Sequence, residues 1–187
     1  MDREYISRIE PGLRVIVTAG AAGIGRVIVE ALHTHGAHIH VCDIDVDAIE
    51  NLNSSLPEVG TTIADVADAS QVDKFFTEAE SHLGGLDVLV NNAGITMSGK
   101  IENTKLEDWR RIMEVNVDSV FLVTHLSIPL MRMGGGGSIV TLSSVLRITG
   151  TPMISAYTSS QSAVPLLTKS AAPECSVDGI RVHSLHP

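Results

Sequence analysis

Residues 18–25 read Thr-Ala-Gly-Ala-Ala-Gly-Ile-Gly, and this stretch decides the fold. It follows an apolar run at 13–18 and opens a segment of helical period at 24–35. Glycines in a turn from strand to helix leave room for a pyrophosphate, and the free N–H groups and dipole of the helix start favour that anion. The candidate cofactor-binding residues in this turn are Thr18, Gly20, Gly23, Ile24 and Gly25.

Asp43 ends the next apolar run, about 20 residues further on, which is the interval that a dinucleotide site requires. Its carboxylate would accept hydrogen bonds from the adenosine ribose hydroxyls, and its charge would repel the additional phosphate of NADP. The sequence therefore predicts NAD as the cofactor. A structural alternative stays open, in which the glycines form only a tight turn and Asp43 or Asp45 caps a helix.

Short runs rich in Val and Ile alternate along the chain with longer segments of helical period, which is typical of a parallel sheet covered by helices on both faces. Strands are expected at 13–18, 38–43, 62–64, 88–91, 138–143 and 180–186. Helices are expected at 24–35, 46–56, 70–83, 106–133 (in one or two pieces) and 156–175. The sequence thus predicts an α/β fold, a Rossmann-like doubly wound parallel sheet of about six strands, as one domain over residues 1–187.

The composition excludes several classes of partner. Aromatic residues make up only 3% of the 187 residues, which argues against surfaces that stack nucleic-acid bases. The formal net charge of -9 repels polyphosphate backbones and anionic lipid. We expect neither a nucleic-acid partner nor a membrane partner.

Compartment and metal content are also constrained. Cys42 and Cys175 are the only cysteines and are far apart, which suggests a reduced compartment, and residues 1–11 lack the apolar region of a signal peptide. The cytoplasm is the expected location. No Cys or carboxylate completes a tetrahedral set with the four histidines at 33–40, so we expect solvent-exposed histidines and no metal site.

Ser144, Tyr157 and Gln161 form the candidate catalytic group. A tyrosine with a serine alongside suits the transfer of a proton to or from a carbonyl or alcohol oxygen. A free tyrosine ionises near pH 10, so it is a poor base at neutral pH unless a cation favours the phenolate. Gln161 lies one helical turn after Tyr157, where such a cation would be needed, and it carries no charge.

These motifs resemble those of the short-chain dehydrogenase/reductase family, and the resemblance runs through essentially the whole chain. The family's first motif, Thr-Gly-x-x-x-Gly-x-Gly, is matched by Thr18, Gly23 and Gly25, with Ala19 in place of the first glycine. Two further matches imply cofactor contacts. They are the adenine-contacting pair Asp65 and Val66, and the motif that closes the fourth strand beside the cofactor, Asn91, Asn92, Ala93 and Gly94.

The same resemblance assigns catalytic roles. It implies that Tyr157 is the general acid or base, that Ser144 orients the substrate oxygen, and that Asn116 holds a water in a proton relay. Gln161 replaces the family's lysine, which supplies the cation and holds the nicotinamide ribose. We therefore expect Tyr157 and Gln161 to contact the cofactor and activity at neutral pH to be low.

Two functions follow from the resemblance. One is an NAD(H)-dependent oxidoreductase that interconverts a secondary alcohol and a ketone by hydride transfer. The other is a catalytically silent dinucleotide-binding protein that acts as a partner or regulatory subunit, in which Gln161 is tolerated because no proton moves. The family also implies a homodimer or homotetramer formed through the apolar helix at 119–133 and the helix that carries Tyr157.

The C-terminal part departs further from the family pattern. Pro165 and Pro173 fall inside the expected last helix, and interior prolines remove a backbone hydrogen bond, so a kinked or shortened helix is predicted. The family continues beyond the position of Pro187, a further candidate cofactor-binding residue, into a turn that holds the nicotinamide amide and a substrate loop. We expect a fragment, or the ordered part, of a longer protein.

Overall fold

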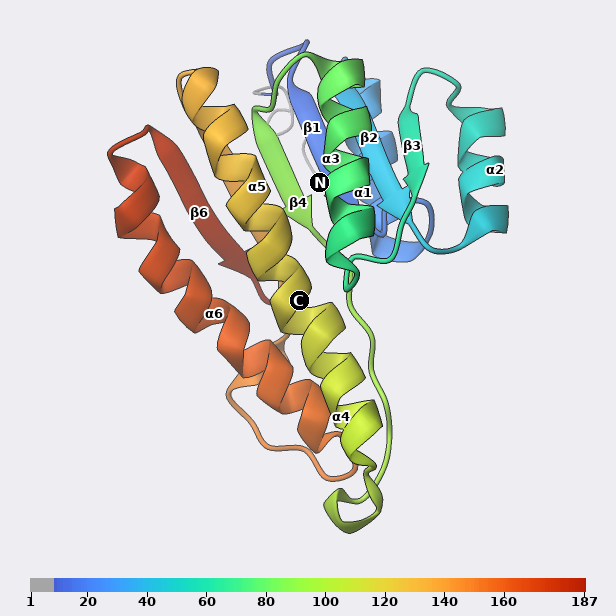
Figure 1. The fold of residues 1–187 in the computed structure, drawn as a ribbon, viewed down its shortest axis with the longest axis vertical. Coiled ribbons are helices and arrows are strands. Elements are labelled where there is room, and N and C mark those ends of the chain that lie inside the picture. The colour runs from blue at the N-terminus through green and yellow to red at the C-terminus, as the bar shows by residue number, and fades with distance from the viewer. Residues whose placement is uncertain (1–8) are drawn as a thin grey trace, which may run out of the picture.

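The computed structural model describes residues 9–187, so most of the segment 1–11 lies outside it. Within this range the chain forms a six-stranded parallel sheet in the order β3-β2-β1-β4-β5-β6 (Figure 1). The strands are β1 (Arg14–Thr18), β2 (His38–Asp43), β3 (Gly60–Ile63), β4 (Val88–Asn91), β5 (Gly137–Leu142) and β6 (Ile180–Leu185). The helices are α1 (Gly23–Thr34), α2 (Val46–Ser55), α3 (Ala69–Leu83), α4 (Leu106–Met113), α5 (Ser119–Met133) and α6 (Ser155–Ser176). The predicted Rossmann-like fold is confirmed.

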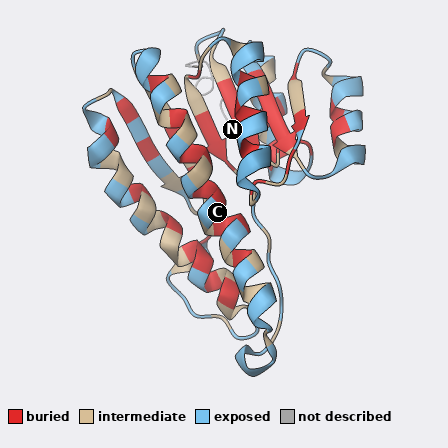
Figure 2. Cartoon of the chain, viewed as in Figure 1, coloured by how far each residue is buried: buried red, intermediate tan, exposed pale blue. Residues whose placement is uncertain are grey.

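Helices cover both faces of the sheet, and the alternation of side chains along β1 shows how. Ile16 joins a core cluster with residues of α3, α5 and α6, whereas Val15 and Val17 join a second cluster with residues of α1 and α2. Buried residues accordingly line the strands and the inner sides of the helices (Figure 2). Among residues 9–187, no helix is both long and apolar enough to cross a membrane.

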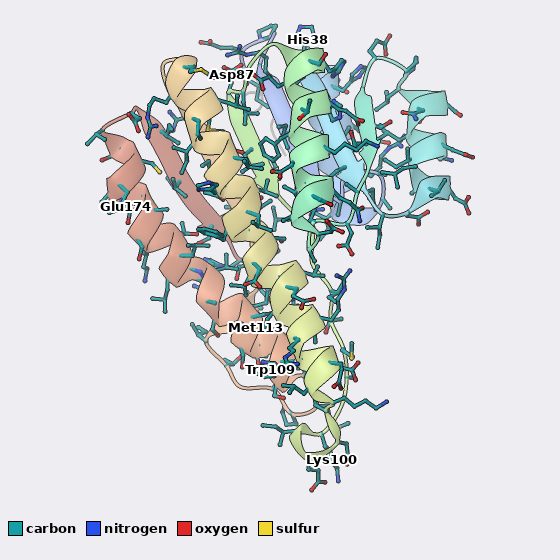
Figure 3. All side chains as sticks on the ribbon, viewed as in Figure 1. His38, Asp87, Lys100, Trp109, Met113 and Glu174 are labelled. Atoms are coloured by element: carbon teal, nitrogen blue, oxygen red, sulfur yellow. The ribbon has the colours of Figure 1, made fainter. Side chains whose placement is uncertain are left out.

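The order of the strands reverses between β1 and β4, which pair in parallel with Val15 opposite Val88. In doubly wound sheets, ligands bind in the crevice at the carboxyl ends of the strands at such a switch point. At the opposite edge lies Asp87, labelled in Figure 3. Arg14 pairs with it through Nη2 and Oδ1 at 2.6 Å and through Nε and Oδ2 at 2.9 Å. This bidentate pair joins the amino ends of β1 and β4 and leaves the carboxyl edge for the site.

The predicted elements, α6 included, lie within about two residues of the observed ones. This helix continues from Ser155 to Ser176 through Pro165 and Pro173, so the expected shortening is wrong. The carbonyl of Gln161, which Pro165 leaves without its helical N–H, accepts a hydrogen bond from Ser143 Oγ at 3.0 Å. The carbonyl that Pro173 leaves without its helical N–H belongs to Lys169, an exposed residue, where water can bind it.

His40 corrects the expectation that the histidines at 33–40 are all exposed. Its side chain is buried between β2, β3 and α3, with Nε2 at 3.0 Å from Thr62 Oγ1. Thr62 in turn donates to Glu78, and the ring of His82 lies edge-on to that of His40 with centroids 5.4 Å apart. Burial and the neighbouring His82 lower the pKa of His40 to about 4, although Glu78 opposes them.

This histidine is expected to make the stability depend on pH. Because the unfolded chain takes up the His40 proton below about pH 6.5 and the folded chain resists it, the free energy of unfolding should fall by about 2 kcal/mol between pH 7 and pH 5. Urea unfolding of His40→Gln should lose this difference. The matched control replaces the exposed His183 by Gln and should keep it, and an equal pH dependence in the parent and His40→Gln would contradict the assignment.

Candidate active site

The glycine-rich turn between β1 and α1 is held by the end of β4. Asn92 Nδ2 donates to the carbonyl oxygens of Thr18 and Ala19, at 3.1 and 2.9 Å. The backbone N–H groups of Asn92 and Ala93 donate to Thr18 Oγ1, both at 3.0 Å. Two motifs that are far apart in the sequence therefore form one structural unit at the switch point.

The backbone of this turn explains its residues. Ala19 and Gly23 both have positive φ angles, 49° and 54°, so Ala19 occupies a left-handed conformation where the family has glycine. A Cβ on Gly25 would overlap the Ala19 carbonyl oxygen and lie 2.6 Å from Asn92 Nδ2. A Cβ on Gly20 would lie 2.9 Å from the side chain of Val41. Glycine at 20 and 25 lets the helix start pack directly against the two strand ends.

Asp43 lies at the carboxyl end of β2 and faces the turn. Its Oδ2 accepts the backbone N–H of Ala21 at 3.1 Å, and its Oδ1 accepts that of Asp45 at 3.2 Å. Of the two residues considered as a helix cap, Asp45 is the cap of α2, because its Oδ1 accepts the N–H of Ala48. Asp43 is therefore not the cap of α2, and its carboxylate is fixed beside the glycine-rich turn.

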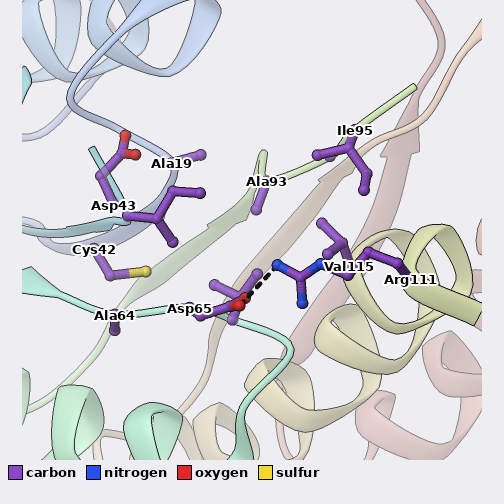
Figure 4. Close-up of a pocket in the computed structure, with 12 residues that line it drawn as sticks. Ala19, Cys42, Asp43, Ala64, Asp65, Ala93, Ile95, Arg111 and Val115 are labelled. Atoms are coloured by element: carbon purple, nitrogen blue, oxygen red, sulfur yellow. Dashed lines mark hydrogen bonds and ion pairs between the residues drawn. The ribbon is translucent and has the colours of Figure 1, made fainter. Parts of the chain in front are cut away.

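A cavity of about 210 Å³ opens next to this carboxylate (Figure 4). Its wall contains five of the predicted cofactor residues: Asp43, Asp65, Val66, Ala93 and Gly94. Arg111 of α4 also lines it and pairs with Asp65, with Nη2 at 2.7 Å from Oδ2. The other oxygen of Asp65 accepts the backbone N–H of Ala67 at 3.0 Å, so this carboxylate is held at both oxygens.

A second cavity, of about 230 Å³, shares residues 93–95 with the first. Its wall contains Tyr157 and Gln161 of α6, Ile24 of α1, and Pro187. The two cavities thus meet at the residues that follow β4, one on each side of the switch point. None of the residues that line the second cavity carries a charged side chain.

Gln161 is the polar group that this second cavity leaves unsatisfied. The residue is only 5% exposed, and its Oε1 has no hydrogen-bond partner among residues 9–187. A buried amide oxygen without a partner is costly, because it has lost water and gained nothing in exchange. The arrangement suits a ligand that donates a hydrogen bond to Oε1.

Asn116 is buried in a π-helical turn, Glu114–Asp118, which joins α4 to α5. Its Oδ1 accepts the N–H of Ile95, while its Nδ2 donates to the Ile95 carbonyl and to Ser160 Oγ, both at 2.9 Å. Ser160 Oγ donates to the carbonyl of Tyr157 at 2.8 Å. The Asn116 side chain therefore ties the segment after β4 to the helix that carries Tyr157, and both of its N–H groups are used.

Ser144 follows β5 and is also buried. Its Oγ accepts the N–H of Leu146 at 3.2 Å and caps the short 3₁₀ turn Val145–Arg147. It does not line the second cavity, which is bordered instead by its neighbour Ser143. The structure therefore brings Tyr157, Gln161 and Pro187 together in one wall, where Ser143 and not Ser144 is the lining serine.

Sequence reasoning missed three residues with defined contacts. Arg111 pairs with Asp65, Ser143 donates to the carbonyl of Gln161, and Ser160 is fully buried between Asn116 and Tyr157. Pro165 was the available signal for Ser143, since a proline inside a helix leaves a carbonyl that needs another donor.

Comparison with known proteins agrees with this geometry. Residues 14–187 match the family model of the short chain dehydrogenases. The NADP-dependent (R)-specific alcohol dehydrogenase of Lentilactobacillus kefiri is 35% identical, over 94% of this chain and 72% of that protein. The 3-alpha-(or 20-beta)-hydroxysteroid dehydrogenase of Mycobacterium bovis is 37% identical, over 94% of this chain and 68% of that protein.

A solved structure shows the same arrangement. It is a crystal structure from Sinorhizobium meliloti 1021 that is named as a short-chain alcohol dehydrogenase. It superposes with a TM-score of 0.90 at 29% identity and covers 96% of this chain and 73% of its own. The six-stranded parallel sheet with helices on both faces is therefore a fold that this chain shares with that protein.

Proposed function

The chain belongs to the short-chain dehydrogenase/reductase family, and on that premise we propose that it binds NAD(H) and interconverts a secondary alcohol and a ketone. The observation that carries the proposal is the pair of cavities that meet at residues 93–95, one beside Asp43 and the other beside Tyr157 and Gln161. A dinucleotide has two halves joined by a pyrophosphate, and the glycine-rich turn lies between the places for them.

The residues present fit such a cofactor. Gly20 and Gly25 let the start of α1 pack directly against the ends of β2 and β4, and the turn opens α1, whose first N–H groups favour a pyrophosphate. Gln161 Oε1 is a buried acceptor without a donor, which a ribose hydroxyl would satisfy. Asp43, Asp65 and Arg111 would hold the adenosine half.

The preference for NAD over NADP rests on Asp43. Its carboxylate is fixed beside the turn by the N–H of Ala21 and would repel the additional phosphate of NADP. Arg111, the basic residue in the same cavity wall, is already paired with Asp65. One relative, the Lentilactobacillus kefiri dehydrogenase, is NADP-dependent, so the preference needs its own measurement.

Replacing Asp43 by Asn should relax this preference. The amide keeps an acceptor for the Ala21 N–H but loses the negative charge. The ratio of the dissociation constants for NADPH and NADH should therefore fall about 10- to 100-fold, which is the effect expected from removing one or two close charge repulsions. Fluorescence titration with both cofactors measures the ratio. Asp45→Asn is the matched control because asparagine still caps α2, and an unchanged ratio in Asp43→Asn would remove Asp43 from cofactor choice.

In the proposed reaction, Tyr157 gives or takes the proton of the substrate oxygen, and Ser144 orients that oxygen. Bound NAD(H) supplies the hydride acceptor or donor. Asn116 has no side-chain N–H left for a relay, so a water in the proton path would have to bind its backbone carbonyl. Gln161 provides an acceptor but no cation, so the cavity wall lacks the positive charge that would favour a phenolate.

The same property of Gln161 favours a second candidate, a dinucleotide-binding protein without turnover that acts as a partner or regulatory subunit. The neutral, buried amide in the cavity wall is the observation that supports it. NADH titration followed by turnover assays on a panel of alcohols and ketones from pH 7 to pH 10 separates the two. Saturable binding with turnover that rises with pH supports the enzyme, binding without turnover at any pH supports the silent protein, and no binding overturns both.

The oligomeric state and the compartment remain proposals. The apolar residues of α5 that suggested an interface, among them Leu122, Leu126 and Leu130, are partly buried against the core of the same chain, so they do not require a partner. The exposed Phe121, stacked on His125, and the exposed Met133 are apolar side chains of that helix that a dimer or tetramer could bury. Both cysteines are free and buried, as expected in the reducing cytoplasm.

A further inference from the structure

We propose that Ser143 is a positioning residue for the cofactor site, because its hydroxyl supplies the hydrogen bond that Pro165 removes from Gln161. The inference rests on the proposed function, in which Gln161 contacts the cofactor. The Gln161 carbonyl needs a donor from outside α6 because a proline lies four residues after it in that helix.

The need for a donor comes from the geometry of the helix. In an α-helix the carbonyl of residue 161 accepts the N–H of residue 165, and proline has no N–H. Gln161 is 5% exposed, so its carbonyl is also shielded from bulk water. A buried carbonyl without a donor is unfavourable, and it would destabilise the turn of α6 that carries Tyr157 and Gln161.

Ser143 supplies the donor from another element. Its Oγ donates to the carbonyl oxygen of Gln161 at 3.0 Å. Its own position is fixed, because its backbone N–H donates to the Leu185 carbonyl at the end of β6 at 2.8 Å and the residue is only 8% exposed. The end of the sheet is thereby bonded to the helix that carries Tyr157, at the buried carbonyl that Pro165 leaves without its helical N–H.

The Ser143 hydrogen bond affects the second cavity because Gln161, whose carbonyl accepts it, lines that cavity. Gln161 and Ser143 both border the second cavity, and the Gln161 Oε1 is the acceptor there that has no partner in the protein. A fixed carbonyl at 161 fixes the Cα from which this side chain projects. Ser143 therefore acts on cofactor binding through the backbone of Gln161.

A double-mutant cycle tests this directly. Ser143→Ala should lower the thermal midpoint by about 4 to 8 °C and weaken NADH binding about tenfold. In the Pro165→Ala background the new N–H satisfies the Gln161 carbonyl, so adding Ser143→Ala should cost less than a third of either effect. Ser143→Thr, which keeps the hydroxyl, should retain NADH affinity.

Pro173→Ala is the matched control, since it restores an N–H in the same helix but to the exposed Lys169. It should not rescue Ser143→Ala. Equal losses from Ser143→Ala with and without Pro165 would overturn the proposal, and rescue of the thermal midpoint without rescue of NADH affinity would overturn the positioning role. If no variant binds NADH while the thermal coupling persists, the proposed function fails and the hydrogen-bond replacement stands.

Discussion

Gly25→Ala is expected to abolish measurable NADH binding and to lower the thermal midpoint by about 6 to 12 °C. The added Cβ would overlap the Ala19 carbonyl oxygen and lie 2.9 Å from the Gly20 Cα, and both are backbone atoms of the turn. Overpacking against atoms that cannot rotate away costs about 3 kcal/mol in a domain of this size. The turn must then open, and the N–H groups of α1 lose their alignment for a pyrophosphate.

Gly84→Ala is the matched control for this substitution. Gly84 caps α3 with a φ angle of 67°, and a Cβ there would meet no atom within 4 Å. Left-handed strain of about 1 to 2 kcal/mol should lower its thermal midpoint while NADH affinity stays at the parent value. Fluorescence titration and thermal unfolding of both variants provide the comparison, and a Gly25→Ala protein that binds NADH as the parent does would rule out the close-packed turn.

The elements of the fold could be predicted because they depend on local patterns. The Val- and Ile-rich run before Thr18 and the glycines after it carry their information within a few residues, and the observed β1 and α1 begin within one residue of the expected positions. The site residues of the turn and of β2 follow from the same local signals. The reversal between β1 and β4 follows from the doubly wound pattern.

The partners of buried polar groups could not be predicted in the same way, because they come from distant segments. Ser160 reads as one of several small polar residues of α6, yet it is fully buried against Asn116, 44 residues earlier. The effect of Pro165 was predicted from the helix alone, where a proline is disruptive, but Ser143, directly after β5, provides the missing donor. His40 was expected at the surface because its partners, Thr62 and His82, lie on other elements.

Gln161→Lys is expected to raise turnover at pH 7 about 100-fold. A cation within a few ångströms shifts the ionisation of an acid by one to three pKa units, and each unit corresponds to a tenfold change in the ionised fraction. Tyr157 and Gln161 lie one helical turn apart and border the same cavity, which carries no charged side chain. The activity of the variant should therefore develop at lower pH than that of the parent chain.

The cavity has room for the longer side chain. Gln161 borders a space of about 230 Å³, and its Oε1 makes no bond to the described residues that the substitution would break. Gln161→Met, which is unbranched and neutral, is the matched control for size and should not raise turnover. An equal gain in Gln161→Met would assign the effect to packing and not to charge.

The most direct test of this account measures turnover at pH 7 together with NADH affinity in the parent chain and in Gln161→Lys. Our account holds that the nucleotide site is intact and that the neutral residue at 161 limits proton transfer. It predicts that both proteins bind NADH with dissociation constants within about threefold of each other, and that only the variant turns over rapidly, by about 100-fold. Equal binding with no gain in turnover for Gln161→Lys would contradict it.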